Sequence, residues 1–302
     1  MSAVATTDET LRWVERQLGA GWRVVARRRL VGGISSAMHR LAVEHPAHGR
    51  RQVVLRRWID TNDYLGDPVA IVERESLTLT SLEGTGIPAP QLLASSTGDD
   101  STGGVPVVLM TRVPGHVHLA PRDHRSWLGQ MASTLAAVHD LQLTLPASPP
   151  RADSPRDVPT WTSRPSLLRA ALDVGASEPP QYEPRFTHGD YQHFNLLWSR
   201  ERLTGVVDWT FSAQGPADRD VAHCRRNLAI LLSADWAEEF RLAYEAETGR
   251  TVHPWFDVRA LTGFSEQWQH FIPLQVGGRI PVDVDGMPGR VEDLLARTMK
   301  RL

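Results

Sequence analysis

The first third of the chain has the hydrophobic pattern of a small antiparallel sheet. Short runs rich in Val, Leu and Arg alternate apolar and polar positions as strands do, and turn residues separate them. Three such runs occupy residues 22–30, 36–44 and 52–58. Their connections are too short for a parallel crossover, so these strands are expected to be antiparallel. Asp67 and Pro68 then have the residue types of an N-cap and a first helical position, and they predict a helix to about Leu82.

After the pair Pro114-Gly115 the apolar spacing becomes mostly helical. An apolar stripe at residues 128–138 would bury one face of a helix. Further helices are expected at about residues 220–233, 234–248 and 291–302. The Pro-Gly pair favours a hinge between lobes. The pattern therefore predicts an α+β chain with a small lobe at 1–113, built on an antiparallel sheet, and a larger, mainly helical lobe at 114–302.

The strongest local signal is a predicted hairpin that directly follows the letters THGDYQHF. Two short strands, 195–198 and 203–207, are expected to be joined by a four-residue loop. Antiparallel pairing would return the chain to the end where it started, so Asn195 and Asp208 are expected to be neighbours. An amide oxygen beside a carboxylate is an oxygen-only pair suited to Mg²⁺. Asp190 precedes Asn195 in the loop that leads to this end, where it would accept a proton from an attacking hydroxyl.

The letters HGDYQHFN, followed after the hairpin by VVDW, resemble the catalytic and metal-binding motifs of the aminoglycoside phosphotransferase and choline kinase-like family. The resemblance implies a two-lobed protein-kinase-like fold with ATP and Mg²⁺ as cofactors. It implies that Asp190 is the catalytic base and that Asn195 and Asp208 hold the metal. The stretch GPADRDVAH resembles the family's segment after the metal-binding Asp, where Asp220 would anchor the catalytic loop. His188 would support the same loop through hydrogen bonds.

The resemblance extends to the nucleotide-binding side of the family. VVLRRW resembles the strand that carries the nucleotide-binding Lys, and Arg56 occupies that position here. This agrees with the composition, because the only Lys of the chain is Lys300. Arg56 would contact the α- and β-phosphates and pair with an acidic residue of the next helix, which is Glu75 by the family's usual context, with Glu73 as the alternative.

Two further segments would contact the nucleotide by the same resemblance. LVGGISSAMHRL resembles the family's glycine-containing phosphate loop, and its predicted contacts are Gly32, Gly33, Ser35 and Ser36. The strand around residues 107–113, which includes Met110 and Arg112, would supply backbone hydrogen bonds to the adenine.

Composition limits the other function classes. The formal net charge of −2 provides no basic surface for nucleic acid and no polybasic membrane patch. No apolar run approaches the ~18 residues that cross a bilayer, and no signal-peptide pattern opens the chain, so the cytoplasm is the expected location. The motif GxxxxGK[ST] of P-loop enzymes does not occur. The sequence says nothing about the oligomeric state.

Alternative readings of the same residues are a hydrolase and a binding module. His188, Asp190 and His193 could form a metal cluster, but a zinc site takes ligands from several places and no second His/Asp motif has a suitable spacing. Cys224 lies at an apolar helix start, as expected of a core residue rather than a nucleophile. A catalytically silent kinase-like module is the non-enzyme alternative, and Arg56 in place of Lys is the only feature in its favour.

The acceptor is left open by the sequence. The resemblance favours a hydroxyl of an aminoglycoside or another antibiotic, while relatives phosphorylate choline, sugars or amino-acid alcohols. A polycationic acceptor would need clustered carboxylates, and one helical stretch offers Asp235, Glu238, Glu239, Glu245 and Glu247. An uncharged acceptor could stack on Trp residues of the second lobe, where Trp127, Trp161, Trp236, Trp255 and Trp268 are candidates. A solvated helix face and a filled core are the simpler interpretations of these two groups.

Overall fold

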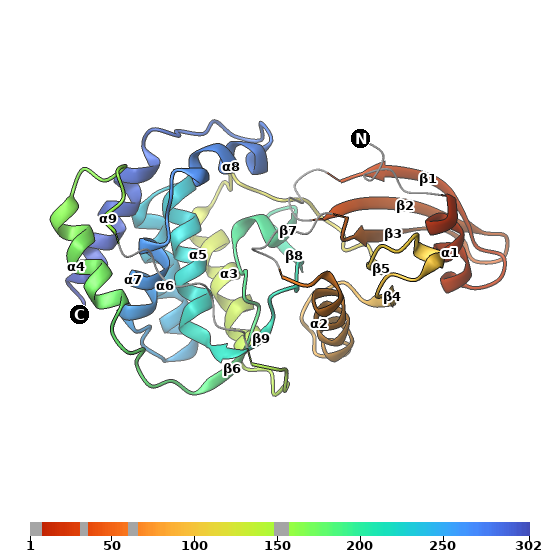
Figure 1. Cartoon of the computed structure of the whole chain (residues 1–302), viewed down its shortest axis with the longest axis horizontal. Coiled ribbons are helices and arrows are strands. Elements are labelled where there is room, and N and C mark those ends of the chain that lie inside the picture. The colour runs from red at the N-terminus through yellow and green to blue at the C-terminus, as the bar shows by residue number, and fades with distance from the viewer. Residues whose placement is uncertain (1–7, 31–35, 60–65, 148–156) are drawn as a thin grey trace. The chain divides into compact units, whose positions relative to one another are not determined.

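The computed structural model describes residues 8–30, 36–59, 66–147 and 157–302 (Figure 1). Its internal contacts divide the chain into two compact units. The first comprises Met1–Pro114 together with Gly205–Phe211, and the second comprises Gly115–Thr204 and Ser212–Leu302. The inclusion of Gly205–Phe211 in the first unit differs from a single division after residue 113, and it assigns Asp208 to the unit that contains Arg56.

The first unit is built on a five-stranded sheet with the strand order β1-β2-β3-β5-β4. Its strands are β1 (Arg23–Arg29), β2 (Ala37–His45), β3 (Gly49–Arg57), β4 (Leu92–Ser96) and β5 (Val107–Thr111). Every neighbouring pair is antiparallel, so the predicted orientation of the first three strands is confirmed. The helices of this unit are α1 (Asp8–Leu18) and α2 (Pro68–Ser81), with a short 3₁₀ helix at Asp100–Thr102.

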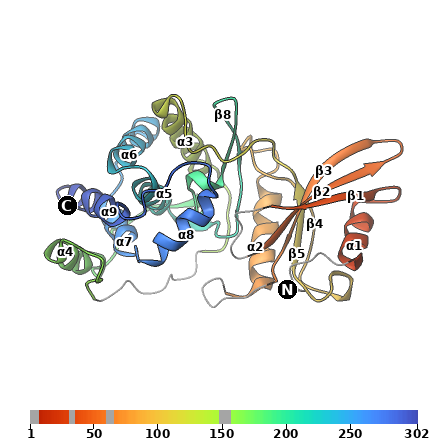
Figure 2. The ribbon, with the colours of Figure 1, turned by 90° about the horizontal axis from the view of Figure 1, so that it is seen from above.

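Strand alternation sends the residues of β3 to two different faces of the sheet. Val53 and Leu55 belong to a core cluster with Trp13 and Val14 of α1, so odd-numbered residues of β3 face α1. Figure 2 shows α1 and α2 on opposite sides of this sheet. Arg56 therefore faces α2, where its ion pair with Glu75 is found.

Helix α2 begins where the sequence predicts. The Asp67 side chain accepts a hydrogen bond from the Val69 backbone N–H, and Pro68 fills the first helical position, whose N–H would have no partner. The helix ends at Ser81, one residue before the predicted end.

The second unit is mainly helical (Figure 1). Its helices are α3 (His124–His139), α4 (Pro165–Gly175), α5 (Ala217–Leu231), α6 (Ala234–Thr248), α7 (Pro254–Thr262), α8 (Gln267–Val276) and α9 (Met287–Met299). Most side chains of α5 are buried, because α6, α7 and α9 all pack against it. The α+β class is confirmed, whereas α4, α7 and α8 were not predicted. In the described part of the chain, no helix has both the length and the apolar character that a membrane span needs.

The predicted hairpin is present, but its loop is shorter than expected. Strands β7 (Leu196–Ser199) and β8 (Arg202–Val206) form a two-stranded sheet, so the loop has two residues and the predicted four-residue loop is wrong. Arg200 and Glu201 both have positive φ, 50° and 60°, as a tight type I′ turn requires. Asn195 ends a 3₁₀ turn, His193–Asn195, immediately before β7 rather than beginning the strand. A second strand pair, β6 (Pro184–Thr187) with β9 (Ala213–Pro216), was not predicted.

Candidate functional site

The Asp190 loop connects β6 to the 3₁₀ turn of the second unit, and both carboxylate oxygens of Asp190 accept hydrogen bonds there. Asp190 Oδ1 lies 3.0 Å from Gln192 Nε2 and 2.7 Å from His223 Nε2. Asp190 Oδ2 accepts from Asn195 Nδ2 at 2.9 Å. Burial is the largest influence on the pKa of Asp190 and raises it, but its contacts with His223, His188 and Asn195 together outweigh burial and lower the pKa below its ordinary value. The carboxylate is therefore ionised and oriented from both sides.

The Asn195 side chain has its nitrogen committed to Asp190. Asn195 Nδ2 donates to the Asp190 carbonyl oxygen and to Asp190 Oδ2, both at 2.9 Å. Because an amide has one donor end and one acceptor end, these bonds fix Oδ1 as the end that remains for a cation. This orientation is the one that a Mg²⁺ ligand requires.

Asp220, on the first turn of α5, holds the start of the Asp190 loop by its backbone. Its Oδ2 accepts from the His188 N–H at 2.7 Å and its Oδ1 from the Gly189 N–H at 2.8 Å. Gly189 has a φ of +80°, which a residue with a side chain rarely adopts. His139 Nε2 lies 3.3 Å from Asp220 Oδ2. Burial raises the pKa of Asp220, but the bond from His139 and nearby positive charges outweigh it and lower the pKa to about 2.

Asp220→Asn is expected to destabilise the protein in a pH-dependent manner. A fall in pKa from 3.8 to about 2 corresponds to about 2 kcal/mol of stability. Because the folded-state pKa is the lower one, this contribution is complete above about pH 4 and is lost as the pH falls from there through about 2. Urea unfolding of both proteins between pH 3 and pH 8 measures it. A stability difference that does not shrink towards pH 3 would contradict the assignment.

Arg56 is the centre of the corresponding cluster in the first unit. Its Nη1 donates to Glu75 Oε1 at 3.0 Å and to Asp208 Oδ1 at 2.8 Å, and its Nε donates to Ser36 Oγ at 2.9 Å. The guanidinium carbon lies 4.3 Å from the centre of the Trp58 ring. Arg56 and Glu75 are both almost completely buried, so their ion pair is not a surface pair of little consequence. Glu75 rather than Glu73 makes the contact.

The charge of Arg56 is stabilised by its acidic neighbours. Burial is the largest influence on its pKa and would lower it, but the charges and hydrogen bonds of Asp208 and Glu75 outweigh burial and raise the pKa above its ordinary value. For Glu75, burial raises the pKa and the Arg56 charge opposes that effect. Arg56 is thus a permanent cation enclosed by acceptors.

Asp208 has a strained backbone and an oxygen that its protein partners leave available. Its φ is +69°, in the left-handed region that an Asp adopts only at a cost of about 1 kcal/mol. Its Oδ1 accepts from Arg56 and from Thr210 Oγ1, the latter at 2.9 Å. Within the described residues, Asp208 Oδ2 has no hydrogen bond, and about 32% of the side chain is exposed. The next residue, Trp209, is fully buried and donates to the Val206 carbonyl oxygen, which fixes the turn.

The remaining residues predicted to contact the nucleotide lie on β5, directly after β5, or outside the described residues. Met110 is buried on β5 and pairs with Val54 of β3 and Leu92 of β4, while Arg112 follows the strand and is exposed. Gly32, Gly33 and Ser35 lie outside the described residues.

Comparison with protein families decides the class of the molecule. A family model described as the phosphotransferase enzyme family matches residues 48–256, more than half of the chain. The chain belongs to this phosphotransferase family. The matched segment contains Arg56, Asp190 and Asp208, and the resemblance seen in HGDYQHFN and VVDW is confirmed.

Solved structures share the fold of this phosphotransferase at low sequence identity. A candidate aminoglycoside phosphotransferase from Ralstonia eutropha JMP134 is 19% identical, with a TM-score of 0.63 over 97% of this chain and 98% of that one. A thermostable mutant of aminoglycoside phosphotransferase APH(4)-Ia, in ternary complex with ADP and hygromycin B, is 16% identical, with a TM-score of 0.61 over 96% and 98%.

Macrolide 2′-phosphotransferase MphH from Brachybacterium faecium is 16% identical, with a TM-score of 0.56 over 98% of this chain and 99% of that one. At these identities the likeness shows the fold alone, and it confirms the predicted protein-kinase-like class. No curated protein sequence is significantly similar to the phosphotransferase.

The two clusters also contain residues that the sequence did not single out. Gln192 and His223 both contact Asp190, and Trp58 stacks on Arg56. One signal was available for His223, because it follows Asp220 by three positions on a helix and so shares its face.

The metal-cluster alternative has no support in the described part of the chain, where no group of three or more His, Cys, Asp or Glu is arranged to hold a metal ion. His193 is fully buried, and burial, the largest cause, lowers its pKa to about 3. A neutral ring is therefore present at every physiological pH. Cys224 is buried, and burial raises its pKa, as expected of a core residue.

The residues that were considered for acceptor binding make contacts within the second unit. In the acidic stretch of α6, Glu238 pairs with Arg225, Glu239 with His124, and Asp235 with Arg297. Of the five Trp residues, Trp127 is buried and the other four are half-buried. Three of these acidic residues thus have partners within the second unit, and only Trp127 among the five Trp residues is buried.

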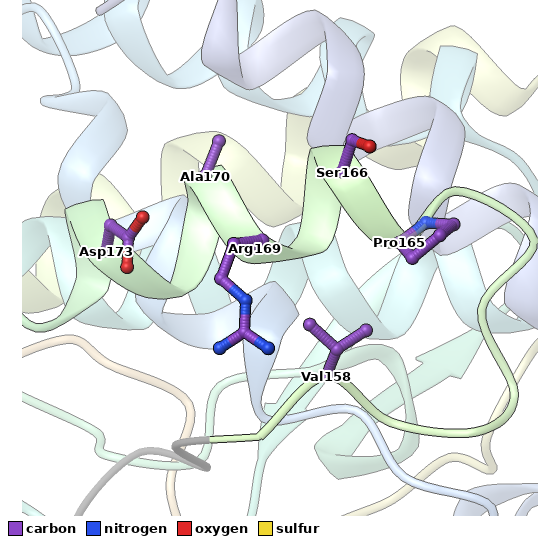
Figure 3. Close-up of a pocket in the computed structure, with 6 residues that line it drawn as sticks. All are labelled: Val158, Pro165, Ser166, Arg169, Ala170 and Asp173. Carbon is purple, nitrogen blue, oxygen red and sulfur yellow. The ribbon is translucent and has the colours of Figure 1, made fainter.

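A surface hollow of about 510 Å³ lies beside α4 (Figure 3). It is lined by Val158, Pro165, Ser166, Arg169, Ala170 and Asp173. Figure 3 shows the Arg169 side chain extending towards Val158 and Asp173 further along the helix. None of the predicted site residues lines this hollow, so we assign no part of the reaction to it.

Proposed function

We propose that this phosphotransferase moves the γ-phosphate of ATP onto a hydroxyl group of a small molecule, and that the molecule is an aminoglycoside or another antibiotic. The observation that carries the proposal is the Asp190 carboxylate, held by Asn195 and His223 within the segment that matches the family model. Phosphoryl transfer needs little covalent chemistry from the protein, so a carboxylate that orients the attacking hydroxyl and groups that neutralise charge are its main requirements.

Asp190 is the proposed catalytic base. Among the described residues, its Oδ2 accepts from one donor, Asn195, whereas its Oδ1 accepts from Gln192 and also lies 2.7 Å from His223 Nε2. A carboxylate oxygen can accept about two hydrogen bonds, so Oδ2 retains capacity for the hydroxyl of the acceptor. Asp220 and His188 support the loop, as the backbone bonds to Asp220 indicate.

Asn195 and Asp208 are the proposed ligands of Mg²⁺. The Oδ1 atom of Asn195 and the Oδ2 atom of Asp208 are the ends that their protein partners leave for a cation. The strands β7 and β8 connect the two residues along the chain as a hairpin, which supports their joint use. The metal would supply charge neutralisation at the transferred phosphate.

Arg56 is proposed to contact the α- and β-phosphates of ATP, with Glu75 holding it in place. Gly33, Ser35 and Ser36 would line the phosphates, and the backbone near Met110 and Arg112 would contact the adenine. Nucleotide binding is supported by similar structures that contain nucleotides, since APH(4)-Ia forms ternary complexes with ADP or AMP-PNP and hygromycin B.

The antibiotic acceptor is supported by what the similar structures act on, namely aminoglycosides and a macrolide. Such an activity would give resistance to the antibiotic, and the cytoplasm, where ATP is made, is the proposed place of the reaction. A kinase of choline, a sugar or an amino-acid alcohol, and a silent binding module, are outcomes that the test below separates.

An acceptor screen tests the proposal. Purified protein is incubated with Mg·ATP and single compounds from a panel of aminoglycosides, macrolides, choline, sugars and amino-acid alcohols, and ADP release is measured. ADP release that depends on one antibiotic, with a phosphorylated product by mass spectrometry, is the expected result. ADP release with a metabolite but with no antibiotic would show that the acceptor is a metabolite rather than an antibiotic. Nucleotide binding without ADP release on any compound would favour the binding module.

Asp208→Ala is expected to remove Mg²⁺-dependent nucleotide binding, because it deletes the proposed carboxylate ligand. Titration calorimetry with AMP-PNP, with and without Mg²⁺, measures the effect, and we expect affinity to fall by at least about tenfold only when the metal is present. Asp285→Ala is the matched control, since Asp285 is exposed. An equal loss of affinity with and without Mg²⁺ would contradict the assignment of a metal ligand.

A further inference from the structure

His223 contacts the proposed catalytic base from a neighbouring element. It lies on α5, one helical turn after Asp220, and its side chain is only about 10% exposed. Its Nε2 is 2.7 Å from Asp190 Oδ1, which is a close polar contact. One helix therefore supplies two contacts to the same loop, Asp220 to its backbone and His223 to its carboxylate.

A second contact determines which nitrogen of His223 carries the proton. Arg226 Nη2 lies 3.1 Å from His223 Nδ1. A guanidinium has donors only, so Nδ1 must be the unprotonated acceptor, and the proton of the neutral ring must be on Nε2. Arg226 is held in turn by the Ala260 carbonyl oxygen, at 3.2 Å from its Nη1, and by the Trp268 ring, at 4.5 Å.

The hydrogen bonds at Asp190 are divided unequally between its two oxygens. Oδ1 accepts from Gln192 Nε2 and is also in close contact with His223 Nε2, at 2.7 Å, so two side chains already engage it. In the part of the chain that the structure describes, Oδ2 accepts only from Asn195. A hydroxyl that approaches the carboxylate therefore finds an acceptor site at Oδ2 rather than at Oδ1.

We propose that His223 is a positioning residue for phosphate transfer: in the Nε2–H tautomer that Arg226 imposes, it occupies Asp190 Oδ1 and leaves Oδ2 as the atom that orients the acceptor hydroxyl. This rests on the proposed function, in which Asp190 is the base. Arg226 acts through His223, and the relay from Trp268 and Arg226 to His223 and Asp190 lies entirely within the second unit.

Nuclear magnetic resonance of ¹⁵N-histidine-labelled protein tests the contact without any substrate. The His223 signals are assigned by their absence in His223→Gln. At pH 7.5 we expect a protonated Nε2 and an unprotonated Nδ1, with the Nε2 signal displaced in Asp190→Asn and the tautomer preference weakened in Arg226→Met. A protonated Nδ1 with an unprotonated Nε2, or His223 signals that Asp190→Asn leaves unchanged, would overturn the inference even if the protein is an active kinase.

Kinetics distinguish positioning from a purely structural role. With the acceptor from the screen, His223→Leu is expected to lower kcat on the order of 10- to 100-fold, while the KM for ATP stays within about twofold. His223→Gln, which can still present an amide N–H to Oδ1, is expected to recover most of the loss. His48→Leu is the matched control, because His48 is exposed in the turn between β2 and β3.

The result that refutes the role is equally specific. A kcat of His223→Leu within about twofold of the wild type, or equal losses in the Leu and Gln variants, would show that His223 only packs against the loop. Thermal unfolding of each variant shows whether a loss of kcat comes from misfolding instead. Failure of the proposed function appears instead as absent turnover in the wild-type protein.

Discussion

Asp190→Asn lowers phosphate transfer by about 10³-fold, with Mg·AMP-PNP affinity nearly unchanged; this is the largest effect on catalysis that we expect. The substitution conserves shape but removes the negative charge that receives the hydroxyl proton. It also replaces one carboxylate oxygen by an NH₂ group. If Oδ2 is the oxygen replaced, this NH₂ faces Asn195 Nδ2, a donor that now lies 2.9 Å from Oδ2. Two donors would then oppose each other, at a cost of about 1–3 kcal/mol in stability.

Initial rates with the acceptor from the screen, and calorimetric titration with Mg·AMP-PNP, measure the two halves of this prediction. Asp285→Asn makes the same chemical change at an exposed position and should be indistinguishable from the wild type. Activity of Asp190→Asn within about tenfold of the wild type would mean that Asp190 does not act as the base.

Arg56→Met is expected to have the largest effect on stability and on nucleotide binding together. It leaves Glu75 buried and Asp208 partly buried without their shared cation, and breaking a buried ion pair in this way costs about 3–5 kcal/mol. Met retains the aliphatic volume against Trp58, so the loss reports charge rather than a cavity. Nucleotide affinity should fall as well, because Arg56 is the proposed phosphate contact.

A double-mutant cycle isolates the pair. Glu75→Gln removes the buried charge that Arg56→Met leaves behind, so the double variant is expected to regain part of the lost stability in urea unfolding, while nucleotide binding stays weak. Arg28→Met, on the exposed side of β1, is the matched control. Additive stability losses in the double variant would show that the two side chains are not coupled.

The elements that the sequence predicted well are those bounded by clear turn or helix-capping residues. The three strands of the first unit and helix α2 follow from alternation, turn residues and the Asp67-Pro68 start, all of which act within a few residues. The hairpin loop was mispredicted because Arg200 and Glu201 carry no Gly or Asn signal for positive φ. Helices α4, α7 and α8 were not predicted, because α4 and α7 begin at a Pro and α8 contains Pro273, and Pro indicates a break in local structure.

The sequence by itself determined the family and the chemical types of the candidate site, because motifs such as HGDYQHFN are local strings whose residues must stand at fixed spacing. The tertiary structure decided which side chains contact these residues, because the spacing of a motif does not specify its partners. The pleat of β3 turns Arg56 towards α2, where Glu75 rather than Glu73 meets it. The packing of α5 against the Asp190 loop brings His223 within 2.7 Å of a carboxylate 33 positions earlier in the chain. Such contacts depend on how whole helices and strands pack against one another. The spacing of residues along the chain does not specify that packing.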